Sequence, residues 1–397
     1  MKKLKILILS AHYPSEMTSG MGLILGNSIT AMIKRKDIKV VLGTITQKVN
    51  DANNYYGGSK NNKIESYKLL YNIKRSTSSR IMIVRSLIKW LLTKSERSFL
   101  KEIKNVSKFS DIAVWFSSSW DPLSFYISKY CKCPVVHHPN DSITRFERMR
   151  KKNNFKAIRL FLARYQERRI INSGFKGIIY VSEKDANEAY NYCLKKSNIK
   201  IIDLPNGVDI DYFKPCNIIA KTYQKPLILL FTGALDYIPN LEAAEYLVKE
   251  IIPPVKSKYQ LRLVGKSSSP KIYSLGKEDG SIIVTGWVSN IAEEYQAADI
   301  FIAPMISGTG FKNKITEAMS CGLPILATDL ALSGFKYCPP GVLKCKTPND
   351  FASKIDYYAK YPQKRKLLGK LNRKFIINGW SWQDRTNRMI SFLKECM

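Results

Sequence analysis

Short apolar runs rich in β-branched residues alternate along the chain with segments of helical periodicity. A first series of runs covers residues 4–10, 38–45, 111–117, 134–137 and 176–182. A second series covers residues 227–233, 260–265, 282–285, 299–304, 323–328 and 341–344. Buried strands that alternate with helices are typical of βαβ units and a parallel sheet. The pattern predicts an α/β protein with two doubly wound, Rossmann-like domains.

A turn-rich connection separates the two series of strands. Residues 204–215 contain Pro205, an Asn206-Gly207 pair and Pro215, all of which favour turns. We therefore expect domains at 1–205 and 206–378, since 397 residues are long for one compact domain. Two consecutive doubly wound domains predict a ligand crevice between them, at the carboxyl ends of their strands.

The chain is strongly basic. It has 64 Lys and Arg against 32 Asp and Glu, a formal net charge of +32. This excess indicates an anionic partner, such as nucleic acid, an acidic membrane surface or a phosphorylated substrate. A generally Lys-, Asn- and Ile-rich composition explains part of it without any partner.

One basic segment also has an apolar side. Residues 145–176 carry eleven Lys and Arg against two acids, and apolar side chains recur at Ile158, Phe161, Leu162, Tyr165 and Ile170. The segment is predicted to form an amphipathic basic helix. Such a helix either has a solvated outer face or docks to anionic lipid or to a lipid-diphosphate acceptor.

Cysteine and hydropathy patterns narrow the class further. The eight cysteines form no CxxC pair and only three histidines are present, so we expect no zinc site. Scattered free thiols suit a protein of the reducing cytoplasm. No run approaches 18 apolar residues, which predicts a soluble or peripherally attached protein.

The most informative stretch lies between residues 299 and 319. An apolar run, Asp299–Pro304, is followed by a loop with Gly308, Thr309, Gly310 and Phe311, and a helical period then begins. Lys312 and Lys314 fall at the start of that helix, where the macrodipole disfavours cations. An anion held by the free N–H groups would explain both lysines, so we predict a phosphate site. Glu317, one turn later, could bind a ribose diol or pair with Lys314 on a solvated face.

Other candidates lie at the ends of predicted strands. Gly20 and Gly22 follow the first strand and could receive a phosphate or an acceptor sugar, or simply form a tight turn. His138 ends the fourth strand and either contacts the donor sugar or acceptor or has a structural role. Gly233 would allow close backbone approach to a ligand, and Asn240 could cap the next helix. Asp209-Ile210-Asp211 matches a metal-binding pattern of another transferase class, which we take as coincidence.

These motifs together resemble the GT-B glycosyltransferases, especially the retaining family 4. Residues 204–215 are similar to that family's interdomain linker, and residues 310–324 to its donor-binding helix and following strand. Residues 231–240, 286–290 and 297–299 also fit. The likeness is greatest to sugar transferases of bacterial exopolysaccharide clusters. Trp380-Ser381-Trp382 resembles the segment that returns to the first domain, so residues 379–397 are expected to pack there.

The resemblance implies a metal-independent, retaining transferase whose donor is a UDP- or GDP-linked sugar, with no other cofactor. Lys312, Lys314 and the loop amides near 308–311 would hold the diphosphate, Glu317 the ribose, and Gly20, Gly22 and His138 the acceptor and donor sugar. The acceptor would be a saccharide or a lipid-diphosphate-linked sugar at the inner face of the plasma membrane, in surface polysaccharide biosynthesis.

Two departures from the family pattern concern the donor. Thr309 replaces the first Glu of the family's Glu-x7-Glu pair, and Ala234 stands where an Arg and Lys pair after the first strand of the second domain usually begins. We infer that Lys312 or Lys314 supplies the missing charge. A sugar-nucleotide 2-epimerase of the same architecture, a basic nucleic-acid-binding protein and a catalytically inactive sugar-binding module are the alternatives.

Overall fold

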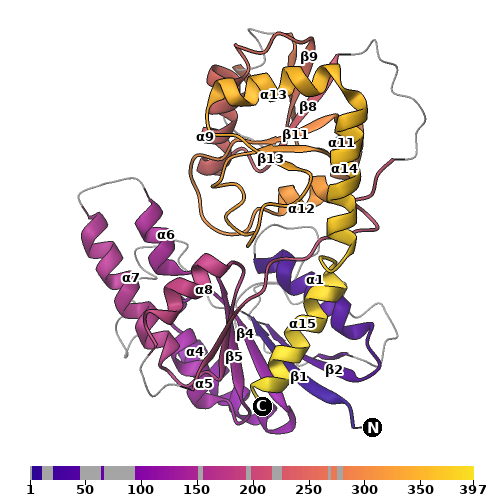
Figure 1. Ribbon diagram of the computed structural model, residues 1–397. Coiled ribbons are helices and arrows are strands. Elements are labelled where there is room, and N and C mark those ends of the chain that lie inside the picture. Colours follow the sequence, from indigo (N-terminus) through magenta and orange to yellow (C-terminus); the bar gives the residue numbers. More distant parts are fainter. Residues whose placement is uncertain are drawn as a thin grey trace. The chain divides into compact units, whose positions relative to one another are not determined.

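The computed structural model describes residues 2–10, 21–44, 64–66, 94–150, 155–193, 198–216, 226–266, 270–274 and 280–397. The chain divides into two compact units. Unit 1 comprises residues 1–205 and 382–397, and unit 2 comprises residues 206–381. Both are α/β units with a parallel sheet flanked by helices, as the alternating pattern predicts (Figure 1).

Unit 1 is built on a seven-stranded sheet in the order β3-β2-β1-β4-β5-β6-β7. Its strands are β1 (Leu4–Ser10), β2 (Ile38–Thr44), β3 (Ile64–Ser66), β4 (Ile112–Phe116), β5 (Val135–Asn140), β6 (Gly177–Tyr180) and β7 (Lys200–Asp203). Its helices are α1 (Met21–Ile33), α4 (Lys94–Val106), the short 3₁₀ turn η1 (Ser107–Phe109), α5 (Ser124–Tyr130), α6 (Ile143–Met149), α7 (Lys156–Ile171), α8 (Glu183–Tyr190) and α15 (Trp382–Glu395). The strands β1, β4, β5 and β6 are completely buried or nearly so, which explains their continuous apolar runs.

Unit 2 is built on a six-stranded sheet in the order β10-β9-β8-β11-β12-β13. Its strands are β8 (Leu227–Thr232), β9 (Tyr259–Val264), β10 (Ile282–Gly286), β11 (Ile300–Ala303), β12 (Ile325–Ala327) and β13 (Val342–Lys344). Its helices are α9 (Ile238–Tyr246), the π turn η2 (Leu247–Ile251), α10 (Pro270–Ser274), α11 (Ile291–Ala297), α12 (Asn313–Ser320), α13 (Pro348–Lys360) and α14 (Pro362–Ile377). Strand order reverses between β8 and β11, and ligands of such sheets bind at this reversal.

The structure differs from the sequence-based predictions in three places. Strands β3 and β7, at the two edges of the unit 1 sheet, had not been predicted. The basic segment 145–176 forms two helices rather than one, because α6 ends at Met149 and Arg150 is extended. The return to unit 1 begins at Trp382 rather than residue 379, since Ser381 pairs with Val208 and the Trp380 carbonyl accepts from the Val208 N–H, both inside unit 2.

The last helix, α15, completes unit 1. It packs on α1, and Phe392 and Cys396 approach β6 so closely that a Cβ at Gly177 would lie 2.7 Å from each. None of the helices within the described ranges combines the length and the apolarity needed to cross a bilayer.

Candidate functional site

The candidate site lies at the reversal of strand order in unit 2. Gly233 directly follows β8, and the loop after β11 leads through Gly308 and Gly310 into α12. Since β8 and β11 are parallel neighbours, their carboxyl ends share one edge of the sheet. The predicted phosphate loop is therefore beside Gly233, although 75 or more residues separate them in the sequence.

There is no space for a side chain at Gly233. Its φ is +152°, and a Cβ there would lie 2.7 Å from Asn240 Nδ2 and 2.8 Å from Lys314 Nζ. Gly265, at the end of the neighbouring strand β9, has a φ of +147°, and its Cβ would lie 1.8 Å from the Gly233 carbonyl oxygen. The approach of a ligand to the Gly233 backbone stays a prediction, and in the structure the side chains of Lys314 and Asn240 approach this glycine.

Lys314 is directed to the end of β8 rather than outward. Its Nζ donates to Asn240 Oδ1 at 2.8 Å and lies 4.3 Å from the centre of the Phe231 ring. Desolvation, reinforced by the neighbouring charge of Lys312, lowers the pKa of Lys314 to about 7. A half-buried ammonium group held next to another cation favours binding of an anion, although Glu317 offsets part of its charge.

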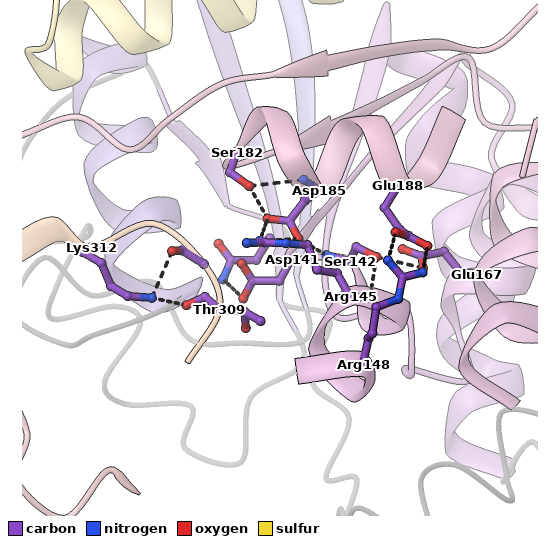
Figure 2. A network of polar contacts seen from close by, with 12 residues as sticks. Asp141, Ser142, Arg145, Arg148, Glu167, Ser182, Asp185, Glu188, Thr309 and Lys312 are labelled. Atoms are coloured by element: carbon purple, nitrogen blue, oxygen red, sulfur yellow. Dashed lines mark hydrogen bonds and ion pairs between the residues drawn. The ribbon is translucent and has the colours of Figure 1, made fainter. Parts of the chain in front are cut away.

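Lys312 occupies the N-cap position of α12, and its ammonium group turns back onto the glycine loop. Its Nζ donates to the carbonyl oxygens of Thr309 and Gly310 (Figure 2). Gly308 and Gly310 have φ values of +96° and +76°, which favour glycine, and Pro239 packs against Gly308. The loop therefore places its amides and one ammonium group at the start of α12, where the first N–H groups have no intrahelical partner.

Phe311 fixes the loop from its other side. Its ring lies 5.3 Å from that of Phe335 and stacks on Trp380 at 6.1 Å between centroids. A Cβ on Gly334 would lie 2.4 Å from Phe311, so the ring fills its site completely. The prediction that the amides near Phe311 bind the donor stays a prediction, and the ring of Phe311 anchors the loop that carries them.

Glu317 is oriented by a fully buried tyrosine. The Tyr295 hydroxyl donates to Glu317 Oε2 at 2.7 Å and lies 2.7 Å from Thr232 Oγ1, at the end of β8. Desolvation raises the pKa of Glu317 and, more strongly, that of Tyr295. Glu317 and Lys314 attract each other, and this attraction lowers the pKa of the carboxyl, but the hydrogen bonds of the two side chains go to Tyr295 and Asn240.

Two contacts at this site had no signal in the sequence. Asn206, buried at the start of unit 2, donates from Nδ2 to Asn313 Oδ1 at 3.0 Å, at the first residue of α12. Asn240 was expected to cap α9, but Tyr237 is the N-cap residue and Asn240 lies inside the first turn. Its amide joins the Ala234 carbonyl to Lys314 instead.

His138 belongs to the interior of unit 1. It has no exposed surface, stacks on Phe116 at 4.9 Å, and its Nε2 accepts from the Arg385 guanidinium at 2.7 Å. Desolvation and the charge of Arg385 lower its pKa well below the usual value. The predicted contact with the donor sugar or acceptor finds no support here, since the imidazole ties α15 to β5.

The remaining candidates from the sequence are Gly20, Gly22 and the Asp209-Ile210-Asp211 pattern. Gly22 is buried in the first turn of α1, and Gly20 lies outside the described residues. Asp209 Oδ1 accepts the N–H groups of Asp211 and Tyr212, so the Asp-x-Asp pattern forms a local turn. Within the described ranges, no three His, Cys, Asp or Glu side chains gather as metal ligands.

Comparison with known proteins agrees with this geometry. Residues 226–360, which contain β8, α9, α12, Gly233, Lys312, Lys314 and Glu317, match the family model of glycosyl transferases group 1. Over 135 residues the chain is 27% identical to a phosphatidyl-myo-inositol mannosyltransferase of Mycobacterium tuberculosis. That segment spans 32% of this chain and 35% of the mannosyltransferase.

Solved structures match over the full length. Sucrose-phosphate synthase from Thermosynechococcus elongatus superimposes with a TM-score of 0.70 and 16% identity, covering 99% of both chains. HepE from Anabaena, solved in complex with UDP, gives a TM-score of 0.69 and 13% identity over 99% of this chain and 100% of the other. The predicted fold is thus confirmed: the chain has the GT-B fold, and its residues 226–360 match the family model of glycosyl transferases group 1.

Proposed function

We propose that the protein is a retaining, metal-independent glycosyltransferase that uses a nucleotide-diphosphate sugar. The observation that carries this proposal is the position of the Lys314 ammonium group, 2.8 Å from Asn240 Oδ1 at the carboxyl end of β8. The family's usual Arg and Lys pair is expected after this strand, where the chain has Ala234 instead. Lys314, which belongs to α12, supplies the positive charge that the missing Arg and Lys would have provided at the end of β8.

The reaction needs stabilisation of the leaving group above all. Breaking the bond between the anomeric carbon and the diphosphate places negative charge on the diphosphate, while the acceptor oxygen forms the new bond to the same carbon. Lys314, Lys312 and the amides at the start of α12 stabilise that charge, because preorganised donors are most effective where charge develops. The acceptor proton passes to the departing phosphate, which leaves no requirement for a protein base.

Glu317 determines how the nucleoside is held. Tyr295 fixes one carboxylate oxygen, Oε2, and the other has no partner among the described residues. A ribose diol offers two hydroxyl donors in a geometry that a fixed carboxylate oxygen accepts well. The proposed donors are UDP- or GDP-linked sugars, in keeping with the UDP bound to HepE.

The proposed acceptor is a saccharide or a lipid-linked sugar in surface polysaccharide biosynthesis, at the inner face of the plasma membrane. The similarity of residues in this chain to a phosphatidyl-myo-inositol mannosyltransferase supports a lipid-linked acceptor. Against the 2-epimerase alternative, His137 and His138 are both fully buried, leaving one of three histidines for chemistry at C2.

The test begins with the donor. Thermal unfolding is measured with UDP, GDP and their common sugar derivatives, since a ligand at 100 times its dissociation constant stabilises by about 2.7 kcal/mol. Glu317→Ala and Lys314→Ala are then titrated with the nucleotide that binds. Wild-type donor affinity in both variants would refute the site, and release of nucleoside diphosphate without acceptor dependence would refute transfer.

A further inference from the structure

The outer surface of helices α6 and α7 is unusually apolar for solvent-exposed helices. Phe155, Ile158 and Phe161 are 67%, 58% and 67% exposed, and Tyr165 is 50% exposed. They follow the spacing of one helix face, while Ala163, Gln166, Glu167, Ile170 and Ile171 are buried on the opposite face. Phe146 and Met149 of the adjoining α6 are partly exposed as well. We call the exposed residues of both helices the hairpin face.

The hairpin face carries exposed arginines. Arg164 and Arg168 are exposed on α7. Arg148 and Arg150 are exposed as well, and they pair with Glu188 at 2.7 Å and with Glu147 at 3.6 Å. The two acids of the segment, Glu147 and Glu167, are 3% and 0% exposed. Glu147 pairs with Arg150 and Arg159, which leaves the positive charge of the face to Arg164 and Arg168.

The buried polar network of unit 1 explains why the acids are inside. Glu167 Oε2 accepts from Ser142 Oγ at 2.9 Å and from the Thr144 N–H at 3.1 Å, and Oε1 accepts from the Tyr180 hydroxyl at 3.1 Å. Next to it, Arg145 binds both carboxylate oxygens of Asp185 at 3.2 Å (Figure 2). Glu147 accepts from Arg159 at 2.9 Å. These bonds fix the orientation of α6 and α7 and leave phenylalanine and arginine side chains on the exterior.

This combination selects among possible partners. Two copies of the face would bring arginines against arginines, so self-association is disfavoured. Duplex nucleic acid offers phosphates but no apolar phase for Ile158 and Phe161. An anionic bilayer offers both, because interfacial helices bury an apolar face at the acyl boundary while their Lys and Arg contact lipid headgroups.

We infer that the hairpin face docks the protein on an anionic lipid bilayer, with Phe155, Ile158 and Phe161 inserted and Arg164 and Arg168 on the phosphate headgroups. The inference deepens the proposed function and rests on it for the lipid-linked acceptor that such docking would bring within reach. Vesicle binding itself needs neither donor nor acceptor, so the two ideas fail separately.

The experiment uses the full chain and sedimentation with vesicles. Phosphatidylcholine vesicles containing about one-third phosphatidylglycerol are compared with pure phosphatidylcholine, at low and high salt. We expect binding to the anionic vesicles only, weakened by salt, and weakened at least about tenfold by Ile158→Ser with Phe161→Ser or by Arg164→Gln with Arg168→Gln. Tyr337→Ser, which removes an aromatic side chain 76% exposed on unit 2, is the matched control and should bind as wild type.

Other outcomes overturn the inference. Equal binding to both vesicle types, or unchanged binding by both double variants, excludes docking through this face. Concentration-dependent dimers that Phe161→Ser abolishes would show that a second copy of the chain covers this face. Binding to an RNA duplex with the same salt dependence as vesicle binding would show that nucleic acid does. The double variants should retain the nucleotide-induced thermal shift, and Lys314→Ala should retain vesicle binding, which separates this surface from the donor site.

Discussion

A lysine with a pKa near 7 makes donor binding dependent on pH. Burial and Lys312 lower the pKa of Lys314 from its usual value of 10.5 to about 7, so above neutral pH the free protein has lost this charge. A bound diphosphate restores the proton, and binding must then take one up from solution. We predict that donor affinity falls with rising pH above 7, approaching tenfold per pH unit.

Calorimetry tests this prediction. Titrations at pH 8 in buffers of different ionisation enthalpy should show proton uptake for the wild type. Lys314→Arg keeps the charge and should lose the pH dependence, since a guanidinium stays protonated. Lys314→Ala should weaken donor binding by about 1.5–3 kcal/mol at neutral pH. Proton uptake that persists in Lys314→Arg would assign the linkage to another group.

The lowered pKa of Lys314 also makes the free energy of unfolding depend on pH. Because the pKa of Lys314 is lowered in the folded protein, the unfolded chain binds more protons between about pH 7 and 10.5. The contribution of this residue to the free energy of unfolding therefore rises with pH across that window and is constant below it. Denaturation of the wild type and Lys314→Met over this range should converge as pH rises.

At the residue level, sequence could identify charges but not their partners. Two lysines at a helix start after a glycine loop predicted an anion site, and the structure places Lys314 at the carboxyl end of β8, where that site was expected. The Tyr295–Glu317 bond and the Asn206–Asn313 bond could not be predicted, because the partners lie 22 and 107 residues apart and come together only in the folded sheet. His138 was expected at the end of a strand, yet β5 continues to Asn140 and Arg385 of α15 bonds the imidazole.

Among the elements, the end of β8 has the strictest geometric requirement. A side chain at Gly233 would need a φ of +152° and would displace Asn240 and Lys314. We predict that Gly233→Ala lowers the free energy of unfolding by more than about 1 kcal/mol and weakens donor binding as much as Lys314→Ala does. Gly280→Ala is the control, since a Cβ there meets nothing within 4 Å. Denaturant titration and nucleotide titration of both variants measure the two effects.

Element prediction succeeded where strands are buried on both faces and at the edges of the unit 2 sheet, and it failed at the edges of the unit 1 sheet. Central strands such as β4 and β8 appear in the sequence as uninterrupted apolar runs. Edge strands β3 (Ile64–Ser66) and β7 (Lys200–Asp203) are short and include charged residues, so their pattern resembles a loop. Residues 145–176 divide because α6 ends at Met149, where Arg150 takes an extended backbone, and α7 begins at Lys156.

For the whole molecule, the two units differ in how continuous they are in sequence. Unit 2 is one segment, residues 206–381, with an uninterrupted core that runs from Val208 to Ile376. We predict that this segment, expressed alone, folds cooperatively and still binds the nucleotide diphosphate, because Gly233, Lys312, Lys314 and Glu317 all lie within it. A thermal shift of the isolated segment with the preferred nucleotide measures this. A segment that folds and shows no such shift would place essential donor contacts in unit 1.

Unit 1 cannot be separated in the same way, because its last helix comes from the far end of the chain. Helix α15 buries Met389, Ile390, Phe392 and Leu393, and its Arg385 donates to Ser28 Oγ and His138 Nε2. Four such side chains contribute about 6–12 kcal/mol at most, comparable with the whole stability of a typical domain. Residues 1–205 alone are therefore expected to lack a cooperative thermal transition, and a chain in which 382–397 follows 1–205 through a flexible linker should regain it. Cooperative unfolding of 1–205 without α15 would show that this helix is dispensable, and that the Arg385–His138 bond serves something other than holding unit 1 together.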